Sequence, residues 1–263
     1  RLKKWLVYQK LSRHKSVSGY LPATACGSSM HDIKIMISRH SYLFLKSSDG
    51  SGGREVFSLE KCGNEFCFRY YRQGRHRTRY VSNLSELCTE MKTIGLRPDR
   101  IIIQQGIRLL TYRRRPLDLR ILMVKDKNGI WNAVYNQVRL APKGAVITNA
   151  SLGGQVKNYH DLLPMLQKRY PRIPSEKQII DVCLLIVRYI EKELGSFGEI
   201  GIDLGIDENC KIWLLEANSK PSKLPEQGIE ETAGISPQFL MTIQYAQFLY
   251  SKVQPHYGSS TQR

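Results

Sequence analysis

The chain lacks several features that would assign it to a specialised class of protein. Its six cysteines include no Cys-x-x-Cys pair, so neither a zinc site nor a disulfide framework is indicated. No apolar run approaches the roughly 20 residues that a membrane-spanning helix needs, and residues 1–8 contain no signal-peptide core. Internal repeats and low-complexity tracts are also absent. These absences favour a globular protein in a reducing compartment, and we expect a cytoplasmic location.

Acidic residues are scarce, with 23 Asp and Glu against 40 Lys and Arg, which gives a formal net charge of +17. Such an excess indicates an anionic partner: a nucleotide, a nucleic acid, an acidic polymer or a membrane surface. Charge alone does not choose among them. The 263 residues, 41% of them hydrophobic, are enough for one large domain or two intimately packed ones.

The most informative stretch, residues 201–221, is predicted to form a β-hairpin of two apolar strands. Because side chains alternate along a strand, Glu216 and Asn218 project from the same face of the second strand. Asp203, on the first strand, lies near the position opposite Glu216. Two carboxylates and an amide oxygen that converge on an apolar hairpin favour a Mg²⁺ site, since Mg²⁺ prefers hard oxygen ligands. A surface hairpin with solvated polar residues is the alternative.

A second candidate site lies between the predicted strands 42–46 and 55–59. Lys46 ends the first strand, and a glycine-rich turn follows it. Glycines let backbone N–H groups approach phosphate oxygens closely, while the lysine adds a positive charge. The stretch is not a Walker P-loop, because Gly-Lys-Ser/Thr is absent and no helix follows. It predicts either a phosphate lid or a flexible turn.

Residues 65–81 are predicted to form a further hairpin, in which aromatic residues alternate with arginines. Such a surface can stack bases or grip phosphates, and a solvated basic sheet face is the alternative. The arginines are Arg69, Arg72, Arg75, Arg77 and Arg79.

Another predicted hairpin, with strands at 117–125 and 130–139, places Asp118 and Arg120 on one face. An arginine inside an apolar strand needs an anionic partner. For Arg120 this partner could be a phosphate, a substrate carboxylate or Asp118. A buried strand at residues 100–107, which breaks at Gly106, precedes this hairpin.

Helical periodicity predicts six helices. Ser82 is expected to cap the third, and Gly195 ends the fifth, as a helix C-terminus favours. The chain after residue 253 is expected to be disordered. The helices are predicted at about residues 1–15, 30–37, 82–94, 157–169, 175–194 and 236–252.

The order and spacing of these motifs resemble the ATP-grasp superfamily of Mg-ATP-dependent ligases over almost the whole chain. Within it, the chain is similar to the YheC/YheD family, described as endospore coat-associated proteins of spore-forming bacteria. Each motif is weak alone, but the combination is specific for ATP-grasp. The motifs are Lys4-Trp5, Tyr20-Leu-Pro-Ala-Thr24, residues 42–46 with the Gly-Ser-Gly-Gly loop, Ile103-Gln-Gln-Gly-Ile107, Arg115-Pro-Leu-Asp-Leu-Arg120, Thr148-Asn149 with Gly153-Gly154, and Asp203 with Glu216-Ala-Asn-Ser-Lys-Pro221.

The resemblance implies a role for each of these residues. Lys46 would contact the α- and β-phosphates of ATP, and Lys4 would match a second nucleotide-binding lysine. The resemblance further implies a mobile lid, formed by Gly50, Ser51, Gly52 and Gly53, and an interdomain hinge that holds the adenine, formed by Gln104, Gln105, Gly106 and Ile107. Two Mg²⁺ ions would be bound by Asp203, Glu216 and Asn218. The γ-phosphate and the acyl-phosphate would be stabilised by Arg120 and Asn149, with Arg139 as a further candidate.

The fold that the resemblance implies is an α+β ATP-grasp domain over residues 1–253, in which two α+β subdomains with antiparallel sheets clasp a nucleotide. The lid-bearing subdomain would cover about residues 40–105, and the metal- and substrate-binding subdomain residues 106–253. Complete ATP-grasp ligases usually carry an additional N-terminal α/β domain, whereas this chain begins almost at the first nucleotide-binding element. In addition, Gln104 and Gln105 stand where many relatives place a carboxylate for the ribose.

The implied function is ATP-dependent joining of a carboxylate to an amine or thiol through an acyl-phosphate, on a small-molecule or peptide-like substrate, with a link to the spore coat. A kinase without amine capture would share the first half-reaction. A non-catalytic module that binds polyanions or spore-coat layers through its basic surface is a third hypothesis. The intact set of Asp203, Glu216 and Asn218 disfavours it, because buried charges without a metal are costly.

Overall fold

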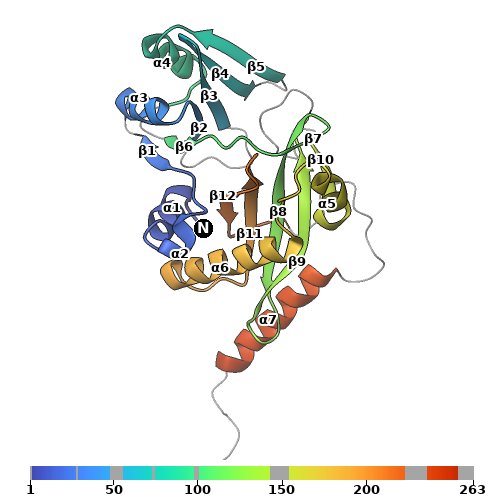
Figure 1. Ribbon diagram of the computed structural model, residues 1–263. Helices are drawn as coiled ribbons and strands as arrows, with labels where there is room; N and C mark the ends of the chain where they lie inside the picture. Colours follow the sequence, from blue (N-terminus) through green and yellow to red (C-terminus); the bar gives the residue numbers. More distant parts are fainter. Residues whose placement is uncertain are drawn as a thin grey trace, which may run out of the picture.

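The computed structural model describes residues 2–27, 29–47, 56–72, 75–97, 101–142, 154–222 and 236–253. Two antiparallel β-sheets, one above the other in Figure 1, are joined by the segment that follows residue 105. Each sheet has its own hydrophobic core and its own covering helices. The cores do not merge, so the protein has two layers of structure that can shape a site between them.

The first sheet contains six strands in the order β1-β6-β2-β3-β4-β5. Neighbouring strands β2 to β5 are consecutive in the chain, whereas β6 returns to pair with both β1 and β2. The elements of this layer are β1 (Thr24–Gly27), α3 (Met30–Arg39), β2 (Tyr42–Ser47), β3 (Val56–Cys62), β4 (Glu65–Arg72), β5 (Arg75–Val81), α4 (Leu84–Thr93) and β6 (Ile101–Gln105).

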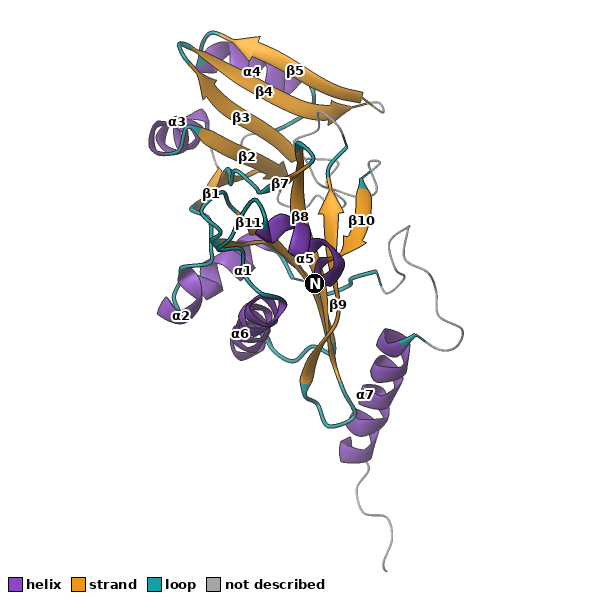
Figure 2. Cartoon of the chain, turned by 45° about the vertical axis from the view of Figure 1, so that its right-hand side comes forward, coloured by secondary structure: helices purple, strands orange, loops and turns teal. Residues whose placement is uncertain are grey.

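Side chains of β2 show how the first sheet divides its faces. Leu43 and Leu45 are fully buried and pack in the core with residues of α3 and α4. Phe44 and Lys46 alternate with them and therefore point to the opposite face. The two helices cover only one side of this sheet (Figure 2), so Lys46 lies on the side without helices.

The second sheet has the order β10-β9-β8-β11-β12, and β7 pairs with β8 beside this path. The predicted hairpins β8–β9 and β11–β12 are both present. The elements of this layer are α1 (Lys4–Leu11), α2 (Lys15–Ser18), β7 (Thr111–Tyr112), β8 (Arg115–Lys125), β9 (Trp131–Leu140), β10 (Gln155–Asn158), α5 (Tyr159–Gln167), α6 (Glu176–Leu194), β11 (Glu199–Ile206), β12 (Ile212–Asn218) and α7 (Pro237–Val253).

One face of the second sheet is apolar and packs against α5 and α6. Leu119 and Ile121 belong to this core, and they alternate with Asp118 and Arg120, which therefore occupy the opposite face. Helix α6 begins with a capping box at Ser175 and ends at Gly195, whose φ of 93° favours glycine. The helix was thus predicted correctly together with its C-terminal glycine.

The connection between the two sheets is held closely on both sides. The amide of Gly106 donates to the carbonyl of Tyr42 at 2.8 Å, and a Cβ at Gly106 would come within 2.2 Å of the Tyr42 ring. Only glycine fits against the ring at this point. Farther on, Leu109 forms an isolated bridge with Asp207 of the second sheet.

Some predicted boundaries were wrong. The N-cap of α4 is Asn83, whose side chain accepts hydrogen bonds from the amides of Ser85 and Glu86, rather than Ser82. The short hairpin of β7 and β8 was not predicted; Arg113 and Arg114 form its two-residue turn, with φ values of 49° and 61°. Such turns usually contain Asn or Gly, which explains why the hairpin was missed.

Helix α7 lies beside the end of the β8–β9 hairpin (Figures 1 and 2). The aromatic ring of Tyr245 in this helix packs near Gly198, and that of Phe248 packs near Gly129. No helix in the described ranges is long and apolar enough to cross a membrane.

Candidate functional site

A row of polar side chains crosses the second sheet on the face opposite its apolar core. Arg120 of β8 stands opposite Gln137 of β9 on one side and Asp203 of β11 on the other. Asp203 in turn stands opposite Glu216 of β12. Residues opposite one another in antiparallel strands point to the same face, so Gln137, Arg120, Asp203 and Glu216 form one continuous row. The predicted pairing of Asp203 with Glu216 is confirmed by this register.

Charges in the row are paired with one another. The Nε of Arg120 lies 2.8 Å from the Oδ1 of Asp203, and a nitrogen of Arg139 lies 3.1 Å from its Oδ2. Arg139 also makes two hydrogen bonds to Asp118, at 2.7 and 2.6 Å. The partner of Arg120 is therefore Asp203 rather than Asp118, which was the third alternative. Two arginines and two aspartates thus form a compact, largely buried network on this face.

The Arg120–Asp203 contact is close but poorly aligned. Among the described residues, neither the Nε of Arg120 nor the Oδ1 of Asp203 has a hydrogen-bond partner of good geometry, although both are buried. The same holds for the Oε1 of Gln137, whose residue is only 1% exposed. Buried polar atoms without hydrogen bonds are costly. A further polar ligand at this row would satisfy them.

Lys46 of the first sheet faces this row across the gap between the layers. Its Nζ donates to the Oε1 of Gln104 at 2.7 Å, and the Nε2 of Gln104 donates to the Oγ1 of Thr24 at 3.2 Å. Burial lowers the pKa of Lys46, and the nearby Lys4 lowers it further, while Glu216 and Asp203 oppose the shift. A charged Lys46 is therefore under-compensated, and an anion beside it would be stabilising.

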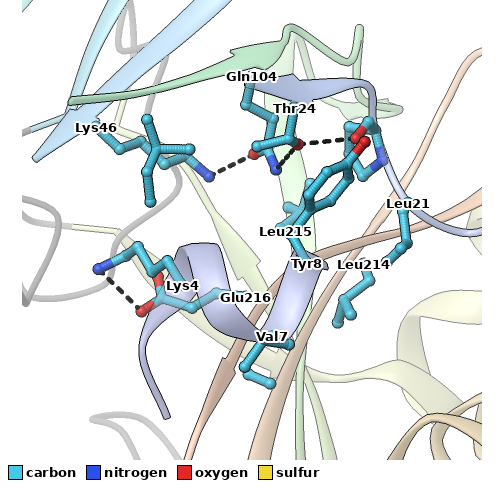
Figure 3. Close-up of a pocket in the computed structure, with 13 residues that line it drawn as sticks. Lys4, Val7, Tyr8, Leu21, Thr24, Lys46, Gln104, Leu214, Leu215 and Glu216 are labelled. Atoms are coloured by element: carbon cyan, nitrogen blue, oxygen red, sulfur yellow. Dashed lines mark hydrogen bonds and ion pairs between the residues drawn. The ribbon is translucent and has the colours of Figure 1, made fainter. Parts of the chain in front are cut away.

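A cleft lies between the layers and is lined by Lys46 and, from the polar row, by Glu216 (Figure 3). Its empty volume is about 480 Å³, part of which is open to solvent. One end carries Lys4, Lys46 and Glu216, with the Nζ of Lys4 at 3.5 Å from the Oε1 of Glu216. The rest is mainly apolar. The lining residues are Lys4, Val7, Tyr8, Leu21, Pro22, Thr24, Lys46, Ile102, Gln104, Leu214, Leu215, Glu216 and Ala217.

The predicted hinge residues divide into two groups. Gln104 lines the cleft, whereas its neighbours are engaged elsewhere. The side-chain Oε1 of Gln105 accepts a hydrogen bond from the amide of Ala23 at 3.2 Å, Gly106 packs against Tyr42, and Ile107 is buried. Of the predicted hinge residues, the structure thus brings only Gln104 to the cleft lining.

A second ion-pair network lies next to the hinge. Glu60 of β3 accepts hydrogen bonds from Arg69 of β4 at 2.8 Å and from Arg108 at 2.7 Å. The guanidinium of Arg108 also lies over the Tyr42 ring, 5.6 Å from its centroid. Partial burial raises the pKa of Glu60, but the hydrogen bonds from Arg69 and Arg108 outweigh it and hold this pKa below its ordinary value.

Several predicted residues cannot be located. The lid residues Gly50, Ser51, Gly52 and Gly53, and also Asn149, lie outside the described residues. Their roles stay predictions.

The predicted metal ligands fit Mg²⁺ by chemistry. Asp203 and Glu216 are opposite one another, and Asn218 follows on the same face of β12. In the described part of the chain, no group of three or more His, Cys, Asp or Glu could hold a metal ion. Among the described residues, the amide oxygen of Asn218 is the predicted third ligand, and its Oδ1 here accepts from the amide of Lys220 at 2.9 Å. Hard oxygen atoms, with other positions left to water and phosphate, suit Mg²⁺.

Apart from Lys4, sequence reasoning assigned no site role to the residues of α1 and of the segment that follows it. Val7 and Tyr8 were not predicted as site residues, yet they line the cleft, and Thr24 accepts a hydrogen bond from Gln104. The polar Gln137 inside an apolar strand was the one sequence signal for its place in the row. The alternation of polar and apolar residues does not tell which apolar side chains line a ligand site.

Comparison with known proteins identifies the family. The family model described as YheC/D like ATP-grasp matches residues 1–249. The chain belongs to the YheC/D-like ATP-grasp family. This confirms the predicted α+β ATP-grasp fold, with two antiparallel sheets and a cleft between them.

Two curated relatives come from Bacillus subtilis. The endospore coat-associated proteins YheD and YheC are each 26% identical to this chain, over 223 and 221 residues, or 84% of it. The chain spans only 48% of YheD and 60% of YheC. Among solved structures, D-alanyl-alanine synthetase A from Vibrio cholerae superimposes with a TM-score of 0.52 over 93% of this chain and 64% of the other, at 11% identity. At that identity the similarity supports the fold alone.

Proposed function

We propose that this ATP-grasp chain is an ATP- and Mg²⁺-dependent ligase that activates a carboxylate as an acyl-phosphate and transfers it to an amine or thiol. The observation that carries the proposal is the convergence of Lys46 from one sheet with the Arg120–Asp203–Glu216 row from the other. Catalysis of phosphoryl transfer depends mainly on positioning and on neutralising charge. Both are properties of this cleft.

The two ends of the cleft suit the two ends of a nucleotide. Val7, Leu214 and Ala217 line an apolar part that a planar base could fill. Lys4 and Lys46 stand at the other end, where phosphate groups would offset the unfavourable burial of the Lys46 ammonium. Phosphates would thus be held by charges that the chain alone leaves under-compensated.

Asp203, Glu216 and Asn218 would hold Mg²⁺, with two ions expected from the resemblance. When bound, the metal supplies charge neutralisation at the β- and γ-phosphates. Arg120, held in the row by Asp203, would stabilise the charge on the transferred phosphoryl group. Arg139, paired with both Asp118 and Asp203, would keep the network in place from below.

The proposed reaction has two steps. A carboxylate oxygen of the substrate attacks the γ-phosphorus, and the bond from this phosphorus to the bridging oxygen breaks, so that ADP leaves with the bonding electrons. An amine then attacks the acyl carbon, phosphate leaves, and the amine loses a proton to solvent. Exclusion of water from the cleft would be needed to protect the acyl-phosphate during this interval.

The first test is nucleotide-dependent thermal stabilisation. A ligand at 100 times its Kd stabilises the folded state by about 2.7 kcal/mol, so ATP with Mg²⁺ should raise the unfolding temperature. Glu216→Gln and Lys46→Met should each abolish most of this shift. Glu208→Gln, an exposed change in the β11–β12 turn, is the matched control and should keep it. Equal shifts in all variants would overturn the assignment of the site.

A second experiment separates ligase from kinase chemistry. With ATP, Mg²⁺ and a panel of carboxylates, hydroxylamine traps an acyl-phosphate as a hydroxamate, whereas a phosphoester gives none. Nucleotide-dependent hydroxamate formation that Glu216→Gln abolishes supports the ligase. Nucleotide consumption without a hydroxamate, together with a stable phosphorylated product, would favour the kinase.

Association with spore-coat layers is the part of the proposal that rests only on the names of YheD and YheC. Fractionation of spores with an antibody against this chain tests it. Recovery in the coat fraction would support the association, and exclusive recovery in the soluble fraction would contradict it.

A further inference from the structure

The edge of the first sheet carries a row of arginines that the proposed reaction does not use. Strand β5 is the last strand in its sheet, so one side of its backbone pairs with no strand in the described ranges. All residues from 75 to 80 are exposed. An exposed edge presents unpaired N–H and C=O groups, which are a template for an added strand.

Arg75, Arg77 and Arg79 alternate along β5 and therefore share one face. Arg72 of β4 stands directly opposite Arg75 and adds a fourth positive charge to the same face. Among the described residues, Arg79 has an acidic neighbour, Glu90, at 3.5 Å, whereas Arg75 and Arg77 form no ion pair. Adjacent like charges repel one another. An anionic partner would remove this repulsion, and the described residues supply only Glu90.

We propose that β5 binds an acidic polypeptide segment by strand addition, with alternate Asp or Glu side chains of the segment facing the arginine row. Side chains on one face of an extended strand repeat at about 6.7 Å, which is the repeat of Arg75, Arg77 and Arg79 themselves. Backbone hydrogen bonds along the edge would supply affinity, and the acidic side chains would supply specificity.

The faces of β4 and β5 favour a peptide over a nucleic acid. Single-stranded nucleic acid needs aromatic rings beside the basic groups on which bases can stack. On the arginine face, however, Phe68 and Tyr70 are buried. The exposed ring of Tyr80 stands opposite Cys67 and hence points to the other face. The arginine row thus offers charge without an exposed stacking surface.

The position of β5 relates this surface to the cleft. Lys46 stands opposite Val56 in β3, and Tyr71 of β4 stands opposite His76 of β5. The start of β5 is therefore three strands from Lys46, or about 14 Å at the usual strand spacing. Arg77 is linked in register to Leu45 of the apolar core, so the arginine row lies on the face opposite to that of Lys46. A segment bound on β5 would therefore lie outside the cleft. The proposal does not depend on ligase activity, and the binding test needs no nucleotide.

Binding is tested with a fluorescent peptide in which Glu and Thr alternate. Replacing Arg75, Arg77 and Arg79 together by Thr, which keeps strand propensity, should weaken binding about tenfold or more. The matched control replaces the exposed Arg13, Arg39 and Arg188 by Gln, with the same loss of charge, and should change binding less than about threefold. Equal weakening in both triple variants would show attraction to net charge and overturn the assignment to β5.

A measurement on the unaltered chain tests the strand geometry. Only one of two alternate sets of peptide amides can face β5, so N-methylation of one set should abolish binding and N-methylation of the other should be tolerated. Equal effects of both peptides would overturn strand addition. Oligodeoxythymidylate of equal charge serves as competitor: if it binds more tightly than the peptide and depends on the same three arginines, the partner is a nucleic acid and the proposal is wrong.

Discussion

The arginine side chains of the two sheets differ in their burial and in their ion pairing. In the second sheet, the side chains of Arg139 and Asp118 are only 6% and 4% exposed and are paired with each other. In the first sheet, Arg77 of β5 is exposed and forms no ion pair with any described residue. The Glu60 network at the hinge lies between these extremes, with Arg69 and Arg108 both bound to one carboxylate. The most buried of these arginines is thus paired on both sides, whereas the exposed Arg77 is not paired within the described residues.

The difference in burial separates arginines that the fold requires from arginines that a partner could reach. A buried charge that lost its partner would be very costly, so Arg139 must be paired before any ligand arrives. An exposed arginine is hydrated and needs no partner for folding. The charges of the second sheet thus shape the cleft, whereas those of β5 remain available to a partner from outside. Substitutions along this series should fall in cost as exposure rises.

The largest effect is expected for Arg139→Met, which leaves Asp118 buried without its bidentate partner. Breaking a buried pair on one side costs about 3–5 kcal/mol, and urea unfolding followed by circular dichroism measures the loss. Arg139→Met combined with Asp118→Leu removes both charges and should regain most of the stability. If the double variant were as unstable as the single one, the cost would come from packing and not from the unpaired charge.

An intermediate effect is expected for Glu60→Gln at the hinge. Two charge-assisted hydrogen bonds, weakened by the partial exposure of Arg108, should contribute about 1–2 kcal/mol at pH 7. Because the pKa of Glu60 is lower in the folded than in the unfolded state, its contribution is present above the ordinary carboxyl pKa and disappears as the pH falls through the folded value. The stability gap between wild type and Glu60→Gln should therefore shrink in urea titrations as the pH falls below the ordinary carboxyl pKa of about 4.3. A gap that stayed constant with pH would mean that the Glu60 charge is not what stabilises the hinge.

Local patterns predicted much of the second sheet. The alternation in residues 201–218 placed Asp203, Glu216 and Asn218 on one face, and the register confirms this. The hairpins are local, since each pairs strands separated by a short turn. The extent of α6 also followed from its own residues, namely its apolar stripe and Gly195.

Non-local pairing could not be predicted in the same way. Arg120 faces Asp203 because β8 pairs with β11, about eighty residues later, and no local pattern sets that register. The two-residue strand β7 is too short for any periodicity. Likewise, Val7 and Tyr8 line the cleft only because α1 packs beside β12. Sequence reasoning thus predicted the polar residues of the second sheet and did not predict the apolar residues of α1 that line the cleft.

The smallest effect on stability is expected for Arg77→Thr on β5, where the side chain is exposed and unpaired among the described residues. Such surface changes usually alter stability by less than about 0.5 kcal/mol, and relief of repulsion from neighbouring arginines could make this one slightly stabilising. Urea unfolding beside Arg139→Met gives the comparison directly. A loss above about 1 kcal/mol would reveal a structural role for Arg77 and break the link between burial and pairing. A variant that keeps its stability but binds the alternating Glu-Thr peptide more weakly would show instead that this arginine serves recognition and not the fold.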